Sequence, residues 1–138
     1  LTGLMGRWQI VQDHHPKIVC DTAHNVGGIE YIVEQLANEK YETLHIVLGM
    51  VNDKDVSKVL ALFPRNAIYY FTRASIPRAL NEMELQMLAQ KKGLTGYPYH
   101  TVAEAVQAAK DWAAPNDFIF IGGSNFVVAD ALEYLLPE

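Results

Sequence analysis

Side chains capable of chemistry follow several short apolar runs of this 138-residue chain. The first group is Asp21, His24 and Asn25, after the apolar run that ends at Cys20. Asp21 can accept hydrogen bonds from ribose hydroxyls, and His24 beside a helix N-terminus can meet an anion. The same residues also suit a structural role, because Asp21 or Asn25 can cap the helix that follows. Taken alone, the residues leave both interpretations open.

Two further groups of charged residues follow later apolar runs. Asp53, Lys54 and Asp55 come after the second run, and capping is the favoured interpretation, with Asp53 as N-cap and Asp55 in the first helical turn. Lys54 can still reach a phosphate from that loop. Arg73 and Arg78 come after the third run and can bind a carboxylate or phosphate through paired hydrogen bonds, or lie in a solvated loop.

The last group is the turn Gly122-Gly123-Ser124. Glycines allow a tight strand-to-helix turn, where Ser124 can bind an anion or act as an N-cap. The turn is no nucleophile elbow, because Phe126 stands where the motif needs glycine. The chain has neither the phosphate-binding G-x-x-x-x-G-K-[ST] nor the dinucleotide-binding G-x-G-x-x-G.

Short apolar runs and helical patterns alternate along the chain, and these elements must position the polar groups. The pattern predicts strands at 8–11, 17–21, 44–48, 67–71, 97–100 and 118–121, and helices at 26–39, 55–63, 81–92, 102–114 and 126–136. Continuous apolar strands joined through helices predict a three-layer, Rossmann-like α/β fold. Its sheet is mostly parallel, with an N-terminal hairpin strand at the edge, and residues 1–138 form one domain. Because such sheets place their sites at the carboxyl ends of the strands, the polar groups are expected along one edge.

Composition excludes several classes of protein. The 11 basic and 16 acidic residues give a net charge of −5, which disfavours nucleic-acid binding. No apolar run approaches the roughly 20 residues that span a bilayer, and the first residues do not resemble a signal peptide. The single cysteine, Cys20, permits no internal disulfide, and no Cys/His pattern indicates a metal site. The cytoplasm is therefore the expected compartment. A chain that begins with Leu1 is expected to be a fragment or a processed chain.

Four strings taken together resemble a known family in their order and spacing. They are Gly6-Arg7-Trp8-Gln9, Asp21-Thr22-Ala23-His24-Asn25, Gly49-Met50-Val51-Asn52-Asp53-Lys54-Asp55 and Gly122-Gly123-Ser124, with Pro77-Arg78-Ala79 in support. They resemble the C-terminal domain of the folylpolyglutamate and dihydrofolate synthases of the Mur ligase superfamily. The resemblance covers nearly the whole chain, and its most specific part is the Asp-x-Ala-His-Asn string with the upstream Gly-Arg-x-Gln.

The resemblance implies a ligase that joins L-glutamate, through its amine, to the carboxylate of a folate or dihydropteroate. ATP is split, with Mg²⁺ present, and the reaction passes through an acyl phosphate. By this likeness, Arg7 and Asp21 reach the ATP held on another domain. His24 and Ser124 face the incoming glutamate, and Asn25 and Arg78 are assigned to substrate binding beside them.

The family holds its P-loop, magnesium ligands and pterin pocket on an N-terminal ATPase domain, which this chain lacks. We therefore expect this chain to be inactive alone and to bind ATP weakly. The alternative is a freestanding small-ligand binding or signalling module. A phosphoacceptor receiver is disfavoured, because Thr72-Arg73 and Gly122-Gly123 stand where it needs an acid and a lysine. A third reading treats the four strings as caps and turns of an unrelated α/β domain.

Overall fold

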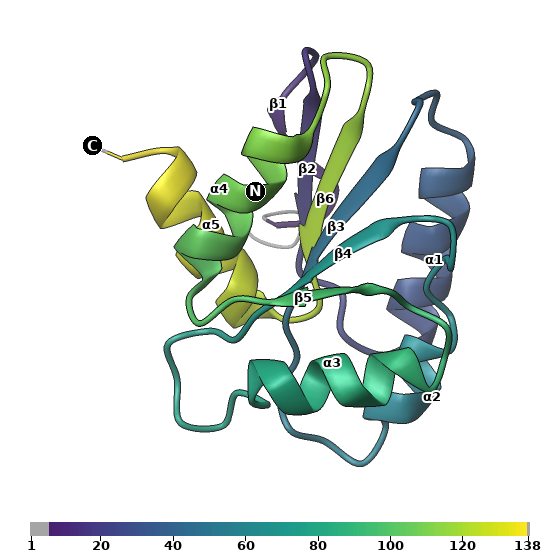
Figure 1. Ribbon diagram of the computed structural model, residues 1–138, viewed down its shortest axis with the longest axis vertical. Helices are drawn as coiled ribbons and strands as arrows, with labels where there is room; N and C mark the ends of the chain where they lie inside the picture. The colour runs from purple at the N-terminus through teal and green to yellow at the C-terminus, as the bar shows by residue number, and fades with distance from the viewer. Residues whose placement is uncertain (1–5, 138) are drawn as a thin grey trace.

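A six-stranded sheet forms the centre of the protein (Figure 1), in a computed structural model that describes residues 6–137. The strands are β1 (Gln9–Gln12), β2 (Lys17–Asp21), β3 (Leu44–Leu48), β4 (Ile68–Phe71), β5 (Gly96–Pro98) and β6 (Phe118–Gly122). They lie in the order β1-β2-β6-β3-β4-β5. Only the β1–β2 pair is antiparallel, and the other four pairs are parallel. The predicted edge hairpin and parallel sheet are confirmed.

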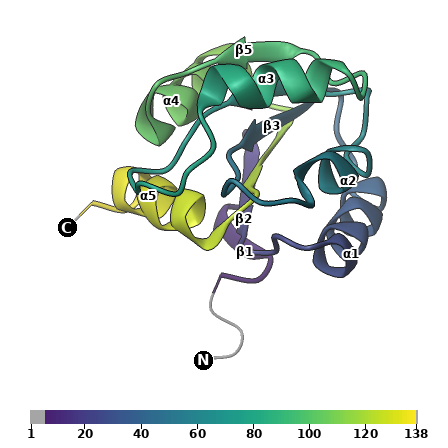
Figure 2. The same ribbon diagram turned by 90° about the horizontal axis from the view of Figure 1, so that it is seen from below.

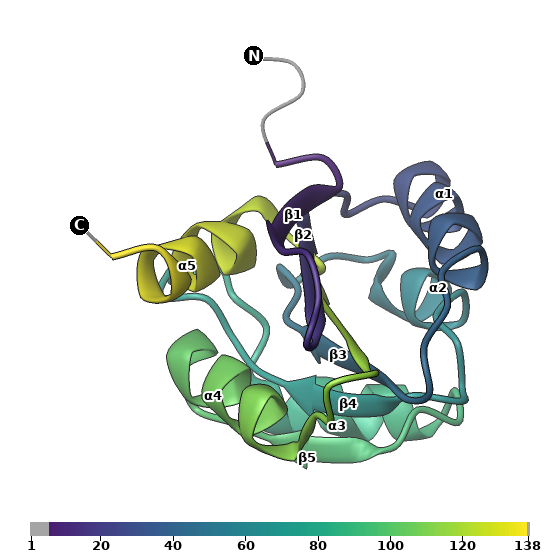
Figure 3. The same ribbon diagram turned by 90° about the horizontal axis from the view of Figure 1, so that it is seen from above.

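Five helices cover the two faces of the sheet, as Figure 3 shows from above. One core cluster packs the sheet against α1 (Val26–Ala37), α2 (Val56–Leu60) and α3 (Glu82–Gln90). The other packs it against α4 (Val102–Trp112) and α5 (Asn125–Leu135). Ile46 and Val47 belong to opposite clusters, because successive side chains of a strand point to opposite faces. The three-layer α/β architecture predicted from the sequence is confirmed. None of the helices in the described part of the chain is long and apolar enough to cross a membrane.

The local differences from the expected elements are small. Helix α2 ends at Leu60 rather than residue 63, and β5 spans Gly96–Pro98 rather than 97–100. The prediction that Asp53 is the N-cap of α2 was wrong. Asp55 holds that position, and the Asp53 carboxylate instead accepts a hydrogen bond from the Asp55 amide (Oδ1–N 2.8 Å). A short acidic side chain can close such a turn two residues ahead as readily as it can cap a helix.

The five parallel strands end at the same edge of the sheet, which Figure 2 shows from below. Close backbone packing at this edge requires glycine. Gly123 has φ +109°, and a Cβ there would collide with the Gly49 carbonyl oxygen. The turn from β6 into α5 therefore lies directly against the end of β3.

The buried histidine of β3 belongs to a hydrogen-bond network toward the opposite end of the sheet. His45 Nε2 lies 2.9 Å from Asp117 Oδ2, and His45 Nδ1 lies 2.8 Å from the Tyr70 hydroxyl. The Asp117 carboxylate also accepts from the backbone amides of Thr43 and Ala114. These partners offset the burial of Asp117, and its pKa is lowered from 3.8. His45 is thus a buried, hydrogen-bonded residue of the core.

Replacing Asp117 with asparagine should lower the free energy of unfolding at pH 7 by about 1–3 kcal/mol, because the buried donors around it lose a charged acceptor. The folded pKa of Asp117 lies below its ordinary value of 3.8. The contribution of this carboxylate is therefore complete above that value and is lost as the pH falls through the folded pKa. Urea denaturation at a series of pH values measures both effects. An Asp117→Asn variant that destabilises in acid as steeply as the unmodified chain would contradict this account.

Candidate functional site

A cleft of about 450 Å³ opens at the carboxyl edge of the sheet. Its walls come from the N-termini of α1 and α5, the loop before α2 and the loop between β4 and α3. It is lined by His24, Asn25, Met50, Val51, Asp53, Asp55, Val56, Val59, Arg78, Gly123, Ser124, Asn125 and Phe126. The four residues assigned to substrate binding in the sequence, His24, Asn25, Arg78 and Ser124, thus line one cleft. A volume of this size suits a small molecule.

The two residues before α1 have hydrogen bonds that leave groups free for a ligand. The Asn25 side chain caps α1 by accepting from the Gly28 amide (Oδ1–N 2.9 Å), which leaves its NH₂ group to donate. His24 Nδ1 lies 3.3 Å from the Thr22 carbonyl oxygen and donates to it. In the neutral ring, His24 Nε2 then carries the lone pair. The capping role suggested for Asn25 and a role toward a ligand are therefore compatible.

Ser124 stands at the N-terminus of the second helix that borders the cleft. Its hydroxyl oxygen accepts from the Val127 amide at 3.1 Å, so Ser124 is the N-cap of α5. The hydroxyl proton remains available to donate. The side chain is buried, and the Gly123 turn fixes its place at the cleft wall. Two helix N-termini, those of α1 and α5, thus border one cleft, and both favour an anion.

Arg78 reaches the cleft from the loop between β4 and α3, and main-chain hydrogen bonds hold its backbone. The Asn52 amide donates to the Arg78 carbonyl oxygen at 2.9 Å, and the Leu80 amide donates to the Met50 carbonyl oxygen at 2.8 Å. These bonds join the β4–α3 loop to the loop after β3. The exposed Arg78 side chain has no ion pair among residues 6–137. Its companion in the sequence, Arg73, lies elsewhere, with its Nε 3.9 Å from a carboxylate oxygen of Glu82.

The cleft also has an acidic side, which the sequence analysis assigned to capping alone. Asp53 and Asp55 line the same cleft as Arg78 and His24. Asp53 and Asp55 both follow the carboxyl end of a parallel strand, where α/β sheets place their sites, and this position could have indicated a role in binding. A cleft with both signs of charge suits a ligand that carries an ammonium and carboxylates together.

Arg7 and Asp21 form a separate group at the end of β2, outside the residues that line the cleft. Arg7 Nε donates to Asp21 Oδ1 at 3.0 Å. The amides of Trp8 and Ala23 donate to the same carboxylate at 2.7 and 2.8 Å. The Thr22 amide in turn donates to the Gly6 carbonyl oxygen at 2.7 Å. The Gly-Arg-x-Gln and Asp-x-Ala-His-Asn strings are therefore fastened to each other.

The exposures of Arg7 and Asp21 differ sharply. The Asp21 side chain is 1% exposed, whereas the Arg7 side chain is 44% exposed. Three protein donors already occupy the Asp21 carboxylate, so in this conformation it orients the Arg7 guanidinium and has little surface for a ligand. The neighbouring Cys20 is inert, because burial raises the pKa of its thiol to about 12.

The family resemblance implies ATP and Mg²⁺. Among the described residues, Arg7 has the chemistry to bind a phosphate group of ATP. The Arg7 guanidinium has free N–H donors, is always charged and suits a phosphate oxygen. Within residues 6–137, no three His, Cys, Asp or Glu side chains gather in a way that could hold a metal ion.

Comparisons with known proteins identify the family of this chain. Residues 6–125 match the family model described as Mur ligase, glutamate ligase domain. The dihydrofolate synthase/folylpolyglutamate synthase of Escherichia coli is 32% identical over 136 residues, which cover 96% of this chain and 31% of that protein.

Solved structures of folylpolyglutamate synthase/dihydrofolate synthases are also similar to this chain. The structure of E. coli FolC in complex with DHPP and ADP superimposes with a TM-score of 0.83 at 30% identity, over 93% of this chain and 30% of that one. A bifunctional folylpolyglutamate synthase/dihydrofolate synthase with Mn, AMPPNP and L-glutamate bound gives a TM-score of 0.86 at 27% identity, over 96% of this chain and 32% of that one. This chain thus spans about a third of the length of these relatives. On the family match over residues 6–125, the chain belongs to the Mur ligase family, to the part described as its glutamate ligase domain.

Proposed function

We propose that this chain is the C-terminal domain of an ATP-dependent ligase that adds L-glutamate to the carboxylate of a folate or dihydropteroate. The observation that carries the proposal is the mixed-charge cleft that brings His24, Asn25, Arg78 and Ser124 together. The E. coli relative, a dihydrofolate synthase/folylpolyglutamate synthase, supports this acceptor class. The related structures with L-glutamate, ADP or AMPPNP bound support the same ligands for this chain. We also propose the cytoplasm as its compartment.

The cleft offers a partner for each charged group of glutamate. Arg78 and the N-termini of α1 and α5 suit its two carboxylates, assisted by the hydroxyl of Ser124 and the amide of Asn25. Asp53 and Asp55 attract its ammonium group. His24 can accept from that ammonium when its ring is neutral, and can donate to a carboxylate when protonated. Glutamate held this way can present its amine, as a free base, to an activated acceptor.

In the proposed reaction, the γ-phosphoryl group of ATP passes to the acceptor carboxylate, and the glutamate amine then displaces phosphate to form the amide. Arg7, oriented by Asp21, would meet the ATP phosphates from this side. A larger N-terminal ATPase domain would supply the P-loop, the magnesium ligands and the pterin pocket. This division of labour makes the isolated chain inactive and a weak ligand for ATP.

The experiment is a ligation assay with labelled glutamate, ATP and Mg²⁺, with a dihydropteroate or a reduced folate as acceptor. The full-length protein that carries this chain should form labelled amide product and ADP, and residues 1–138 alone should form neither. Turnover by the isolated chain, or tight ATP binding to it, would refute the division of labour. ATP-independent glutamate binding by a full-length protein without ligase activity would instead favour a small-ligand binding module.

A further inference from the structure

The loop between β4 and α3, residues 72–81, crosses the carboxyl edge of the sheet from one helical layer to the other (Figure 2). Ala74, near its start, is buried in the cluster that packs against α4 and α5. Leu80, near its end, is buried in the cluster of the opposite face. Arg78 lies between these two anchors and lines the cleft. The position of Arg78 therefore depends on what holds the loop on both sides.

On the cleft side, backbone contacts hold the loop in addition to the buried Leu80. The bonds from Asn52 to Arg78 and from Leu80 to Met50 flank a bridge between Val51 and Ala79. These bonds fix the loop against the loop after β3. None of these three contacts involves α5. Ser124, the N-cap of that helix, lines the cleft together with Arg78.

On the other side, Ala74 packs in the core cluster, and a carboxylate from α5 is hydrogen-bonded to the loop. Asp130 Oδ2 accepts from the Ser75 amide at 2.9 Å, and Asp130 Oδ1 lies 3.3 Å from the Ser75 hydroxyl, which donates to it. The two residues are 55 positions apart, and Ser75 precedes Arg78 by three. Asp130 does not line the cleft and makes no hydrogen bond with Arg7. Among residues 6–137, both side-chain hydrogen bonds of Asp130 go to the loop.

Helix α5 thus supplies one wall of the cleft and holds the segment that supplies another. We infer that Asp130 is a positioning residue, which acts through Ser75 to set where Arg78 stands relative to Ser124. This inference rests on the proposed role of the cleft as the glutamate site. It assigns part of the glutamate affinity to a residue that does not touch glutamate.

The test is steady-state kinetics of the full-length ligase, with glutamate and ATP varied separately. Asp130→Ala should raise KM for glutamate about fivefold or more and leave KM for ATP within twofold. Asp130→Asn keeps an acceptor for the Ser75 amide and should restore part of the affinity. Ser75→Ala, a milder change at an exposed position, should raise KM for glutamate in the same direction. Combining it with Asp130→Ala should add little, because the two residues act as one contact.

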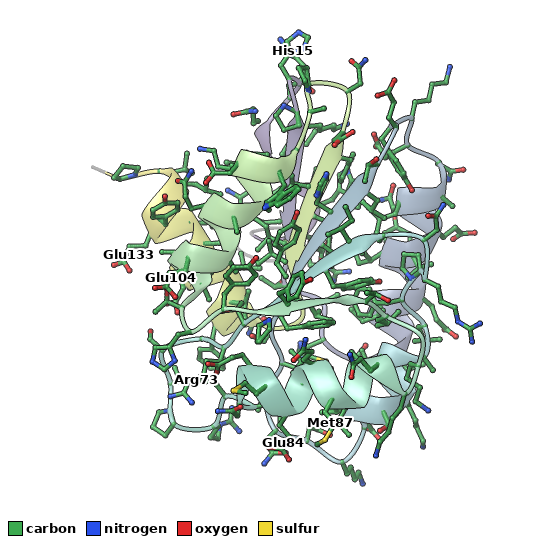
Figure 4. All side chains as sticks on the ribbon, in the orientation of Figure 1. His15, Arg73, Glu84, Met87, Glu104 and Glu133 are labelled. Carbon is green, nitrogen blue, oxygen red and sulfur yellow. The ribbon has the colours of Figure 1, made fainter. Side chains whose placement is uncertain are left out.

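Glu133→Gln is the matched control. Glu133 lies on the same helix, three residues after Asp130 (Figure 4), and among residues 6–137 it makes no hydrogen bond or ion pair with the loop. The Glu133→Gln substitution removes a neighbouring negative charge without changing the bonds to Ser75. It should leave the KM values for glutamate and for ATP unchanged. An Asp130→Ala variant with unchanged glutamate KM, or with equal rises in both KM values, overturns the inference. If Arg78→Ala also leaves glutamate KM unchanged, the proposed glutamate site itself fails. If Arg78→Ala raises it and the Asp130 variants do not, only the positioning role fails.

Discussion

Replacing Arg7 with alanine in the full-length ligase should lower kcat/KM for ATP by about 100-fold, the cost typical of losing one preorganised donor to developing charge. Asp21 and the backbone around it already hold the Arg7 guanidinium, so little ordering is needed when a phosphate arrives. Arg7→Lys should recover only part of the loss, because lysine lacks the planar fork that binds Asp21 and a phosphate together. Initial-rate measurements at varied ATP test this.

Arg65→Ala is the control for Arg7, since Arg65 is an exposed arginine before β4, at the amino edge of the sheet. It should leave kcat/KM for ATP unchanged. An Arg7→Ala enzyme whose kcat/KM for ATP is within about threefold of that of the unmodified enzyme would contradict the proposed contact with ATP.

The same assay separates two roles for Asp21. If Asp21 acts only by orienting Arg7, Asp21→Asn should cost activity in the unmodified enzyme and almost none in the Arg7→Ala enzyme. A full cost in both backgrounds would show that Asp21 contacts ATP itself.

Replacing Arg78 with alanine should raise KM for glutamate about 10- to 100-fold, with KM for ATP within about threefold, because a charge-assisted contact with a carboxylate is lost. The Arg78 backbone is held by the Asn52 and Leu80 bonds, so the substitution should leave the fold intact. Initial rates at varied glutamate measure the effect, and urea denaturation checks the stability. The expected loss concerns glutamate because Arg78 and Arg7 stand in different groups at the same edge of the sheet.

Lys58→Ala is the matched control for Arg78. Lys58 is an exposed cation on α2, 4.0 Å from the carboxylate of Asp55, and does not line the cleft. Its removal changes the net charge near the cleft by the same amount. A glutamate KM that rises equally in Lys58→Ala and Arg78→Ala would mean that general charge, rather than a contact from Arg78, attracts glutamate.

The strands and their common edge follow from the sequence because burial on both faces produces continuous apolar runs. Strands β2 and β3 occupy the predicted ranges, residues 17–21 and 44–48. The element ends were less predictable. Helix α2 ends at Leu60, and the turn after it buries Phe63 while the Phe63 amide donates to the Leu60 carbonyl oxygen at 3.2 Å. Edge strand β5 is short and pairs on one side only, so its sequence carries little apolar pattern.

The cleft residues were predictable for the same reason as the edge, but contacts between distant residues were not. His24, Arg78 and Ser124 follow different strands, and topology alone brings them to one edge. The bond between Ser75 and Asp130 joins residues 55 positions apart and has no local pattern. The family resemblance assigned both Arg7 and Asp21 to ATP. The structure adds that their mutual contact buries Asp21 and exposes Arg7, a division that only the folded geometry decides.

The central claim is that the cleft between α1, α5 and the β4–α3 loop binds glutamate, and hydrogen–deuterium exchange tests it most directly. The full-length ligase is measured with a non-hydrolysable ATP analogue, with and without L-glutamate. Glutamate should slow amide exchange in residues 24–28, 76–80 and 123–127, which form the walls of the cleft. Residues 13–17 and 40–42, around a separate cavity at the amino edge, should not change and serve as the internal control. Glutamate-dependent protection that leaves all three cleft segments unchanged would contradict the account.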